Sequence, residues 1–278
     1  MIDMNLVGKK CGPITYEYTW KDVILYALSI GAQTDELSFI YENAKGGLKV
    51  IPSFCVVMCH DLFVALFKGV KIDASRFIHG EEAMKLYRPI PPEGKVITEG
   101  EITNIYDKGK GALIIWTMRI LTVAGEILAE AEHTIFYVGA GGFGGDPGPK
   151  TEALNPPQGM QPDFAASYFV QENQAALYRL NGDTNPLHVD PEFAKMGGFP
   201  RPILHGLCTY GYAVRAVLHK ACSGNVEKFK EFRARFSGVV YPGDTLITQG
   251  WKVEAGRFLI QARTDRGVVL SNAYAYVG

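Results

Sequence analysis

The chain has 278 residues, a formal net charge of −1 and 47% hydrophobic residues, the balance of an ordinary globular protein with one large or two average domains. Because the charge is near zero and no stretch is basic, we do not expect a nucleic-acid partner. No run approaches the roughly 18 apolar residues of a membrane span, and residues 1–10 lack the apolar core of a secretory signal.

The five cysteines are odd in number and lie mostly in apolar segments, which favours free thiols in a reducing compartment. Cys55 and Cys59, followed by His60 and Asp61, have a spacing that a metal site could use. The surrounding run is apolar, however, and no second ligand pair follows. We therefore predict core packing and no metal here.

Residues 1–138 are predicted to form a first unit. Residues 19–22 have the form of a capping box, so a helix should begin there and end at Gly31. One long buried helix is predicted over 54–67, with Lys68-Gly69 as its end. Segments rich in β-branched and aromatic residues then predict strands at 76–79, 96–106, 112–122 and 127–138.

A linker rich in glycine and proline is predicted over 139–159. Residues 160–278 are predicted to form a second unit that repeats the plan of the first. A short helix at 171–180 leads into a polar motif, and a longer helix follows His205-Gly206. Strands are predicted at 229–236, 244–253, 258–263 and 268–277.

The two units share short sequence patterns. Residues 92–100 and 242–250 both read Pro-x4-Ile-Thr-x-Gly, and residues 137–139 and 276–278 both read Tyr-Val-Gly. Such an internal repeat indicates one supersecondary plan used twice. Each half is predicted to be a long helix wrapped by a curved antiparallel sheet, an α+β architecture that resembles a double hot-dog fold.

The second unit carries the motif Gly182-Asp-Thr-Asn-Pro-Leu-His188. Its glycine, asparagine and proline predict a tight turn, across which Asp183 and His188 could face one small volume. A carboxylate and an imidazole are the usual components of a general acid–base pair. Downstream, Gly206 begins an apolar-periodic run, and a backbone N–H at a helix start can donate to an oxyanion.

A lone Asp-x4-His pair is more often part of a plain surface loop. The glycine before Asp183, Asn185-Pro186 after it, and Ala194 six residues past His188 make the pattern more specific. Together, over 178–194, they resemble the signature of the R-specific enoyl-CoA hydratases, hydratase 2 of the MaoC-like group. Asn181 departs from the small residue that is usual there, but it precedes the catalytic candidates.

The resemblance extends over nearly the whole chain and implies reversible hydration of trans-2-enoyl-CoA to (3R)-3-hydroxyacyl-CoA in fatty-acid β-oxidation. It implies no cofactor, since coenzyme A is part of the substrate. Asp183 and His188 would hold one water, the Gly206 N–H would bind the thioester oxygen, and Asn185 would orient the loop or the water. The further substrate contacts that it implies are His79, Gly80, Lys108, Thr184, Pro186, Leu187 and Phe236.

Two of these residues also have an interpretation without a substrate contact. Lys108 could be a solvated lysine in a turn, and His79 could be a structural histidine. The remaining histidines are interpreted as structural or exposed: His60, His133, His205 and His219. Lys195 and Arg201 lie near the motif, where they could meet CoA phosphates, although the spacing does not require it.

The first half has Gly-Ala-Gln-Thr at 31–34 in place of the motif, and no histidine follows. We therefore expect one site per chain, with the first half accommodating the acyl chain. The resemblance suggests a homodimer and a peroxisomal location, although residues 275–278 are not a Ser-Lys-Leu signal, and a cytoplasmic location stays open. The alternatives are a non-catalytic acyl-thioester-binding module, a hot-dog thioesterase or an acyl-carrier-protein dehydratase.

Overall fold

The computed structural model describes residues 2–67, 76–150 and 153–278. The first half runs from an edge strand through short helices to long strands. Its elements are β1 (Lys10–Tyr18), α1 (Trp20–Ser29), α2 (Leu37–Ile40), α3 (Phe54–Val57), α4 (His60–Phe67), β2 (Phe77–Leu86), β3 (Gly94–Asp107), β4 (Gly111–Thr122) and β5 (Ile127–Val138).

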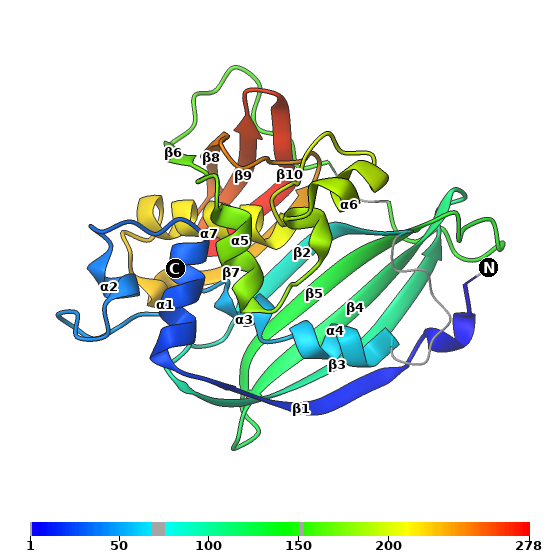
Figure 1. Ribbon diagram of the computed structural model, residues 1–278, viewed down its shortest axis with the longest axis horizontal. Helices are drawn as coiled ribbons and strands as arrows, with labels where there is room; N and C mark the ends of the chain where they lie inside the picture. The colour runs from blue at the N-terminus through cyan, green and yellow to red at the C-terminus, as the bar shows by residue number, and fades with distance from the viewer. Residues whose placement is uncertain (1, 68–75, 151–152) are drawn as a thin grey trace.

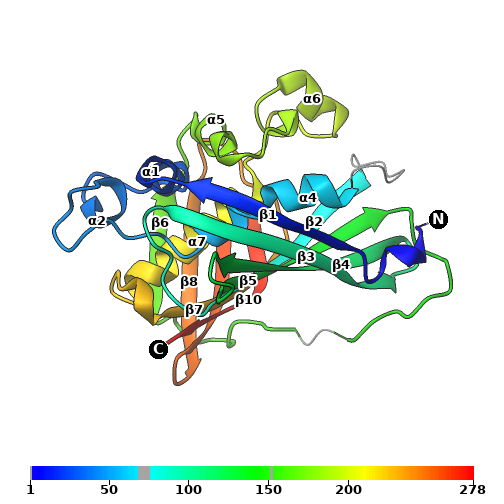
Figure 2. The same ribbon diagram turned by 90° about the horizontal axis from the view of Figure 1, so that it is seen from below.

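The second half follows the same general order, with one strand, then helices, then four strands. They are β6 (Phe164–Phe169), α5 (Gln174–Tyr178), α6 (Pro191–Met196), α7 (Gly206–Lys220), β7 (Phe229–Phe236), β8 (Thr245–Glu254), β9 (Arg257–Thr264) and β10 (Gly267–Val277). Among the helices of these described ranges, none has both the length and the apolar character to cross a membrane. In two views the strands curve around the central helices, and α6 projects from the body of the molecule (Figures 1 and 2).

The described strands form one sheet in the order β1-β3-β4-β5-β2-β7-β10-β9-β8-β6. Each half contributes five consecutive strands, and the two orders mirror each other about the antiparallel β2–β7 pair, which we call the junction. This mirrored order is what a duplicated unit produces when its two copies join edge to edge. The predicted α+β architecture with an internal repeat is therefore confirmed.

The core of the second half is α7, whose residues Cys208–Leu218 are all buried. Side chains also connect the two halves at the helix level. The Gln174 amide donates to the backbone oxygens of Leu28 and Ser29, at 3.1 and 2.6 Å. Asn181 donates to the Ser29 hydroxyl at 2.9 Å, so the residue before the motif is fixed to the first half of the chain.

Two sequence-based predictions are wrong in extent. The continuous helix predicted over 54–67 is two helices, α3 and α4, with Met58-Cys59 between them. Periodicity does not reveal this break, because apolar residues continue at helical spacing on both sides of it, at positions 54, 58, 62 and 66. The predicted end at Lys68-Gly69 lies outside the described residues. The strand predicted at 76–79 continues to Leu86, because Glu81 and Glu82 find charged or polar partners inside the sheet.

The cysteines are free thiols, as predicted, and four of them are buried. Cys55 and Cys59 lie fully buried among the core residues of α3 and the start of α4. Other predicted elements agree closely with the structure. Thr19 N–H donates to the Asp22 carboxylate at 2.7 Å in the predicted capping box, and Gly31 follows α1 with a left-handed φ of +80°.

Candidate active site

The motif loop between α5 and α6 is held by its own side chains. Gly182 has a φ of +122°, which an L side chain rarely adopts, and this reverses the chain after Tyr178. The Asn185 N–H donates to the Asp183 carboxylate at 3.1 Å, while the Asn185 side-chain oxygen accepts from the Leu187 N–H at 3.0 Å. Asn185 thereby caps a 3-10 turn, Pro186–His188, that ends at the histidine.

The folded loop brings Asp183 and His188 together with a residue from a different segment, His205. Each of the three offers a side-chain nitrogen or oxygen, and these atoms lie within 4.8 Å of one another. Asp183 is half-buried, whereas both histidines are buried. The arrangement therefore has a partly accessible carboxylate beside imidazoles that are shielded from water.

His188 has one ring nitrogen committed to the backbone. Its Nδ1 lies 2.8 Å from the carbonyl oxygen of Ile203, and since a carbonyl only accepts, Nδ1 carries the proton. Burial lowers the pKa of His188 below its ordinary value of 6.5, against opposing effects from Ile203 and Asp183. At neutral pH the ring is uncharged, and its Nε2 lone pair is free to accept a proton.

His205 stacks on His188, with ring centroids 3.7 Å apart. Its Nε2 donates to the backbone oxygen of Asp183 at 3.2 Å, so one imidazole fixes both the ring and the main chain of the pair. Burial and the neighbouring His188 lower the pKa of His205, which favours its neutral form. The sequence predicts a structural or exposed role for His205; the residue is buried, not exposed, and it touches both candidates. The one signal in the sequence is its place directly before Gly206.

Gly206 is the first residue of α7, and His205 is the N-cap. The first N–H groups of a helix have no partner within it and form its positive end. A Cβ placed on Gly206 would lie 3.3 Å from Cε1 of Phe236, which comes from the end of β7. The glycine therefore keeps open the space between the helix start and the Phe236 ring.

His79 is a residue of the first half that lies near Phe236 and the start of α7. The ring of His79, on β2, lies 4.8 Å from the ring of Phe236, so two predicted substrate-contact residues meet across the junction. Gly80 sits at a register shift between β2 and β5, and such bulges often lie next to functional sites. His79, Phe236 and Gly206 thus form a continuous series of contacts from the first half to the start of α7.

Other predicted contacts lie differently. Lys108 occupies the β3–β4 turn, where its ammonium donates to the Pro147 carbonyl of the linker and lies 5.8 Å from the Tyr106 ring. Thr184 and Pro186 are exposed on the motif loop, and Leu187 is half-buried. The motif residues therefore lie near Gly206, and His79 contacts Phe236. Lys108 instead hydrogen-bonds to the linker.

Two groups of side chains among the described residues have a composition that could hold a metal ion: Asp183, His188 and His205, and His79, Glu82 and His133. In the first group, His188 Nδ1 and His205 Nε2 already bond to backbone oxygens. A neutral imidazole, a carboxylate and a helix-terminal N–H in one place can exchange protons and stabilise a developing oxyanion.

Sequence comparison matches residues 16–139 to the MFE-2 hydratase 2 N-terminal domain and residues 153–271 to the MaoC-like domain. The chain is 39% identical to a probable enoyl-CoA hydratase 2 of Dictyostelium discoideum, over 98% of this chain and 95% of that protein. It is 38% identical to the peroxisomal multifunctional enzyme type 2 of Mus musculus, again over 98% of this chain but only 38% of the mouse protein.

Solved structures give the same result for the fold. A MaoC-like dehydratase from Phytophthora capsici superposes with a TM-score of 0.91 at 29% identity, over 100% of this chain and 98% of that one. A Mycobacterium tuberculosis protein described as having a double hot-dog fold superposes with a TM-score of 0.63 at 13% identity, over 98% and 95% of the two chains. The predicted double hot-dog fold is confirmed.

Proposed function

This chain belongs to the MaoC-like dehydratase family and is a relative of the enoyl-CoA hydratase 2 enzymes; from that premise we propose that it hydrates trans-2-enoyl-CoA to (3R)-3-hydroxyacyl-CoA, reversibly, in fatty-acid β-oxidation. The observation that carries the proposal is the convergence of Asp183 and His188 within 4.8 Å, next to the start of α7. A surface loop with a capping aspartate and an exposed histidine would not place a buried imidazole beside the Asp183 carboxylate.

Hydration requires an activated water, a proton for C2 and donors for the enolate oxygen. In our proposal Asp183 and His188 hold one water between them. Neutral His188 takes a proton at Nε2 as the water oxygen attacks C3, and the pair then delivers a proton to C2 on the same face. The double bond is lost, one C–O and one C–H bond form, and only water is consumed.

The Gly206 N–H would bind the thioester oxygen, where negative charge develops in the enolate. Donors aimed at that oxygen contribute most when they are fixed before the reaction, and the rigid start of α7 meets this condition. Asn185 would keep the loop in register through its bonds to Asp183 and Leu187. His79, Gly80, Phe236, Thr184, Pro186, Leu187 and Lys108 would contact the rest of the substrate.

Several wider features are part of the proposal. We place the acyl chain in the first half, because that half has the scaffold without the acid–base pair. The reaction needs no cofactor besides the coenzyme A of the substrate. A peroxisomal location is supported by the relatives, which include peroxisomal enzymes of Mus musculus and Arabidopsis thaliana. The homodimer stays a prediction from the family resemblance.

Product analysis tests the proposal against its alternatives. The purified chain is given trans-2-decenoyl-CoA, and loss of the enoyl-thioester absorbance is followed. The product is then offered separately to R-specific and S-specific 3-hydroxyacyl-CoA dehydrogenases. Oxidation by the R-specific enzyme alone is the expected result. Release of free CoA would instead identify a thioesterase, and binding without turnover would identify a non-catalytic module.

A further inference from the structure

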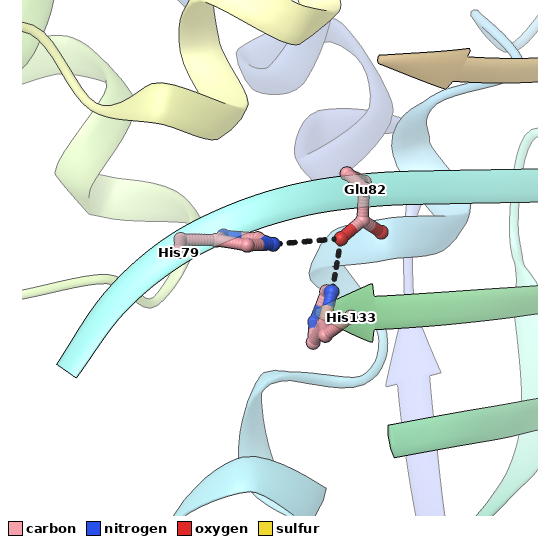
Figure 3. Close-up of side chains that lie close together, drawn as sticks. All are labelled: His79, Glu82 and His133. Atoms are coloured by element: carbon pink, nitrogen blue, oxygen red, sulfur yellow. Dashed lines mark hydrogen bonds and ion pairs between the residues drawn. The ribbon is translucent and has the colours of Figure 1, made fainter. Parts of the chain in front are cut away.

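A buried polar cluster lies beside the junction of the two halves, formed by His79, Glu82 and His133 (Figure 3). Glu82 Oε2 lies 3.1 Å from His79 Nε2 and also hydrogen-bonds to His133 Nδ1. The exposed fraction of the side chain is 0% for Glu82, 9% for His133 and 29% for His79. One carboxylate oxygen therefore connects two imidazoles, and only the His79 end of the cluster reaches solvent.

The sheet register explains why these residues meet. Glu82 and His133 are directly opposite each other on β2 and β5. In a regular strand, residues three apart such as His79 and Glu82 would point to opposite faces. The register shift between His79 and Glu81 inserts one extra residue, Gly80, and so brings both side chains to the same face. The bulge is thus what lets His79 join the cluster.

Such a cluster is unfavourable for stability alone. Burial raises the pKa of Glu82 to about 7 and lowers that of His133 to about 3, since both groups are removed from water. Glu82 Oε1 has no hydrogen-bond partner among the described residues, and an unpaired buried polar atom is costly. Apolar side chains at these positions would avoid this loss of stability. We therefore look for a function of the cluster besides packing.

The accessible end of the cluster faces the candidate active site. The His79 ring contacts the Phe236 ring at a centroid distance of 4.8 Å. Phe236 in turn lies against Gly206, since a methyl group added to that glycine would lie only 3.3 Å from Phe236 Cε1. A ligand whose oxygen binds the Gly206 N–H therefore meets Phe236 first and His79 next.

We propose that Glu82 and His133 are positioning residues that hold the His79 imidazole for contact with acyl-CoA beside its thioester. The inference rests on the proposed function in one respect, namely that an acyl-CoA occupies this site. The His133 ring itself packs against the Trp116 ring, with centroids 5.3 Å apart. Contacts with the sheet core thus restrain His133, which restrains Glu82, and Glu82 in turn restrains the partly exposed side chain of His79. No separate contact between Glu82 and the ligand is required.

A double-mutant cycle on binding tests this inference. Isothermal titration with decanoyl-CoA, a saturated thioester that cannot be hydrated, is carried out on wild type, His79→Gln, Glu82→Gln and the double variant. We expect each single change to raise Kd about tenfold, and the double variant to bind no more weakly than His79→Gln alone. The inference would be overturned if the increase in Kd of the double variant equalled the product of the two single increases, or if Glu82→Gln bound with the wild-type Kd.

The matched control is Glu81→Gln. Glu81 neighbours Glu82 on β2, is also mostly buried, and pairs with Arg233 and Arg235 across the junction. Glu81→Gln should lower Tm and leave the Kd for decanoyl-CoA unchanged. If Glu82→Gln also lowered Tm without changing Kd, Glu82 would have a purely structural role. If Glu82→Gln does not fold, His133→Asn takes its place in the cycle with the same expectation.

The outcomes separate this inference from the proposed function. Wild type that binds decanoyl-CoA but does not hydrate trans-2-decenoyl-CoA would contradict the function and leave the cycle interpretable. Wild type that hydrates, with multiplying effects in the cycle, would contradict the positioning role alone. A Tm increase on adding zinc that Glu82→Gln abolishes would make the cluster a metal site and overturn the inference.

Discussion

The imidazole rings of His188 and His205 stack at a centroid distance of 3.7 Å, with 29° between their planes. His205 also donates to the backbone oxygen of Asp183 at 3.2 Å. A residue from the start of α7 thus holds both members of the acid–base pair, and the oxyanion donor that we propose is its next neighbour, Gly206. The pair and the donor are fixed by one short segment.

Replacing His205 should therefore impair catalysis through positioning. We expect His205→Ala to lower kcat for enoyl-CoA hydration about tenfold or more, since small displacements of reacting groups are costly. His205→Phe should lose less, because it retains a ring against His188. Steady-state kinetics on folded protein measures both. His219→Phe is the control: it should lower Tm and leave kcat unchanged, and equal kcat values for all variants would contradict the role of His205.

The pH dependence follows from the lowered pKa of His188. Because burial keeps the ring neutral below its ordinary pKa of 6.5, the base form should persist as the pH falls through that value. We expect kcat/KM to be nearly constant from about pH 8 to 6.5 and to decline only at lower pH. Initial rates in buffers of constant ionic strength measure this. A decline that already begins above pH 7 would contradict a neutral, buried base.

Gly206 provides a test of the space at the start of α7. In Gly206→Ala the new methyl group would lie 3.3 Å from Phe236 Cε1, so the ring must give by a few tenths of an ångström. We expect kcat/KM to fall about tenfold, less than the roughly 10²–10³ lost when an oxyanion donor is removed, because the N–H remains, while Tm changes little. The matched control is Gly94→Ala, whose methyl would meet Tyr18 Oη at an ordinary 3.5 Å. Equal kinetics for both variants would argue against substrate at Gly206.

Acid stability should depend on Glu36, whose carboxylate is 8% exposed and bonds to Arg215 and His219. Burial raises the pKa of Glu36, but these partners outweigh it and lower the pKa to about 2. A carboxyl with a lowered folded-state pKa stabilises the protein above its unfolded pKa, near 4.3, and this contribution disappears as the pH falls toward 2.

Urea denaturation of Glu36→Gln measures that contribution. We expect the free energy of unfolding at pH 7 to fall by about 2–3 kcal/mol relative to wild type, with the difference shrinking near pH 3. Glu42→Gln is the control, since Glu42 is exposed and bonds only to Asn43 among the described residues. A difference that is the same at both pH values would show that the effect is not ionic.

Much of the fold could be predicted because the strands near the sheet centre alternate clearly. The predicted bounds of strands β7 and β5 match the observed ones. The edge strands β1 and β6 are not predicted. Burial alternates along β6 and over residues 14–18 of β1, but each strand has only one fully buried position, so the core-facing side is weakly marked. The break between α3 and α4 is not predicted either, because apolar residues continue at helical spacing on both sides of it.

The site was predictable as far as it is local in sequence. Asp183, Asn185 and His188 lie in one turn, where spacing alone suggests proximity. His205 and the pairing of Glu82 with His133 depend on how distant segments meet, which no spacing within one element encodes. Gly80 illustrates the limit well: a single bulge decides which face of the sheet His79 occupies.

The most direct test of the central claim is the hydration rate of Asp183→Asn with trans-2-decenoyl-CoA. The variant keeps the shape of the loop and removes the carboxylate. Asp190→Asn is the matched control, because the Asp190 side chain caps α6, its one role among the residues that the structure describes, and asparagine caps a helix equally well. We predict a loss of about 10²–10⁴ in kcat for Asp183→Asn and a wild-type rate for Asp190→Asn. A wild-type rate for Asp183→Asn would contradict the acid–base role of this site.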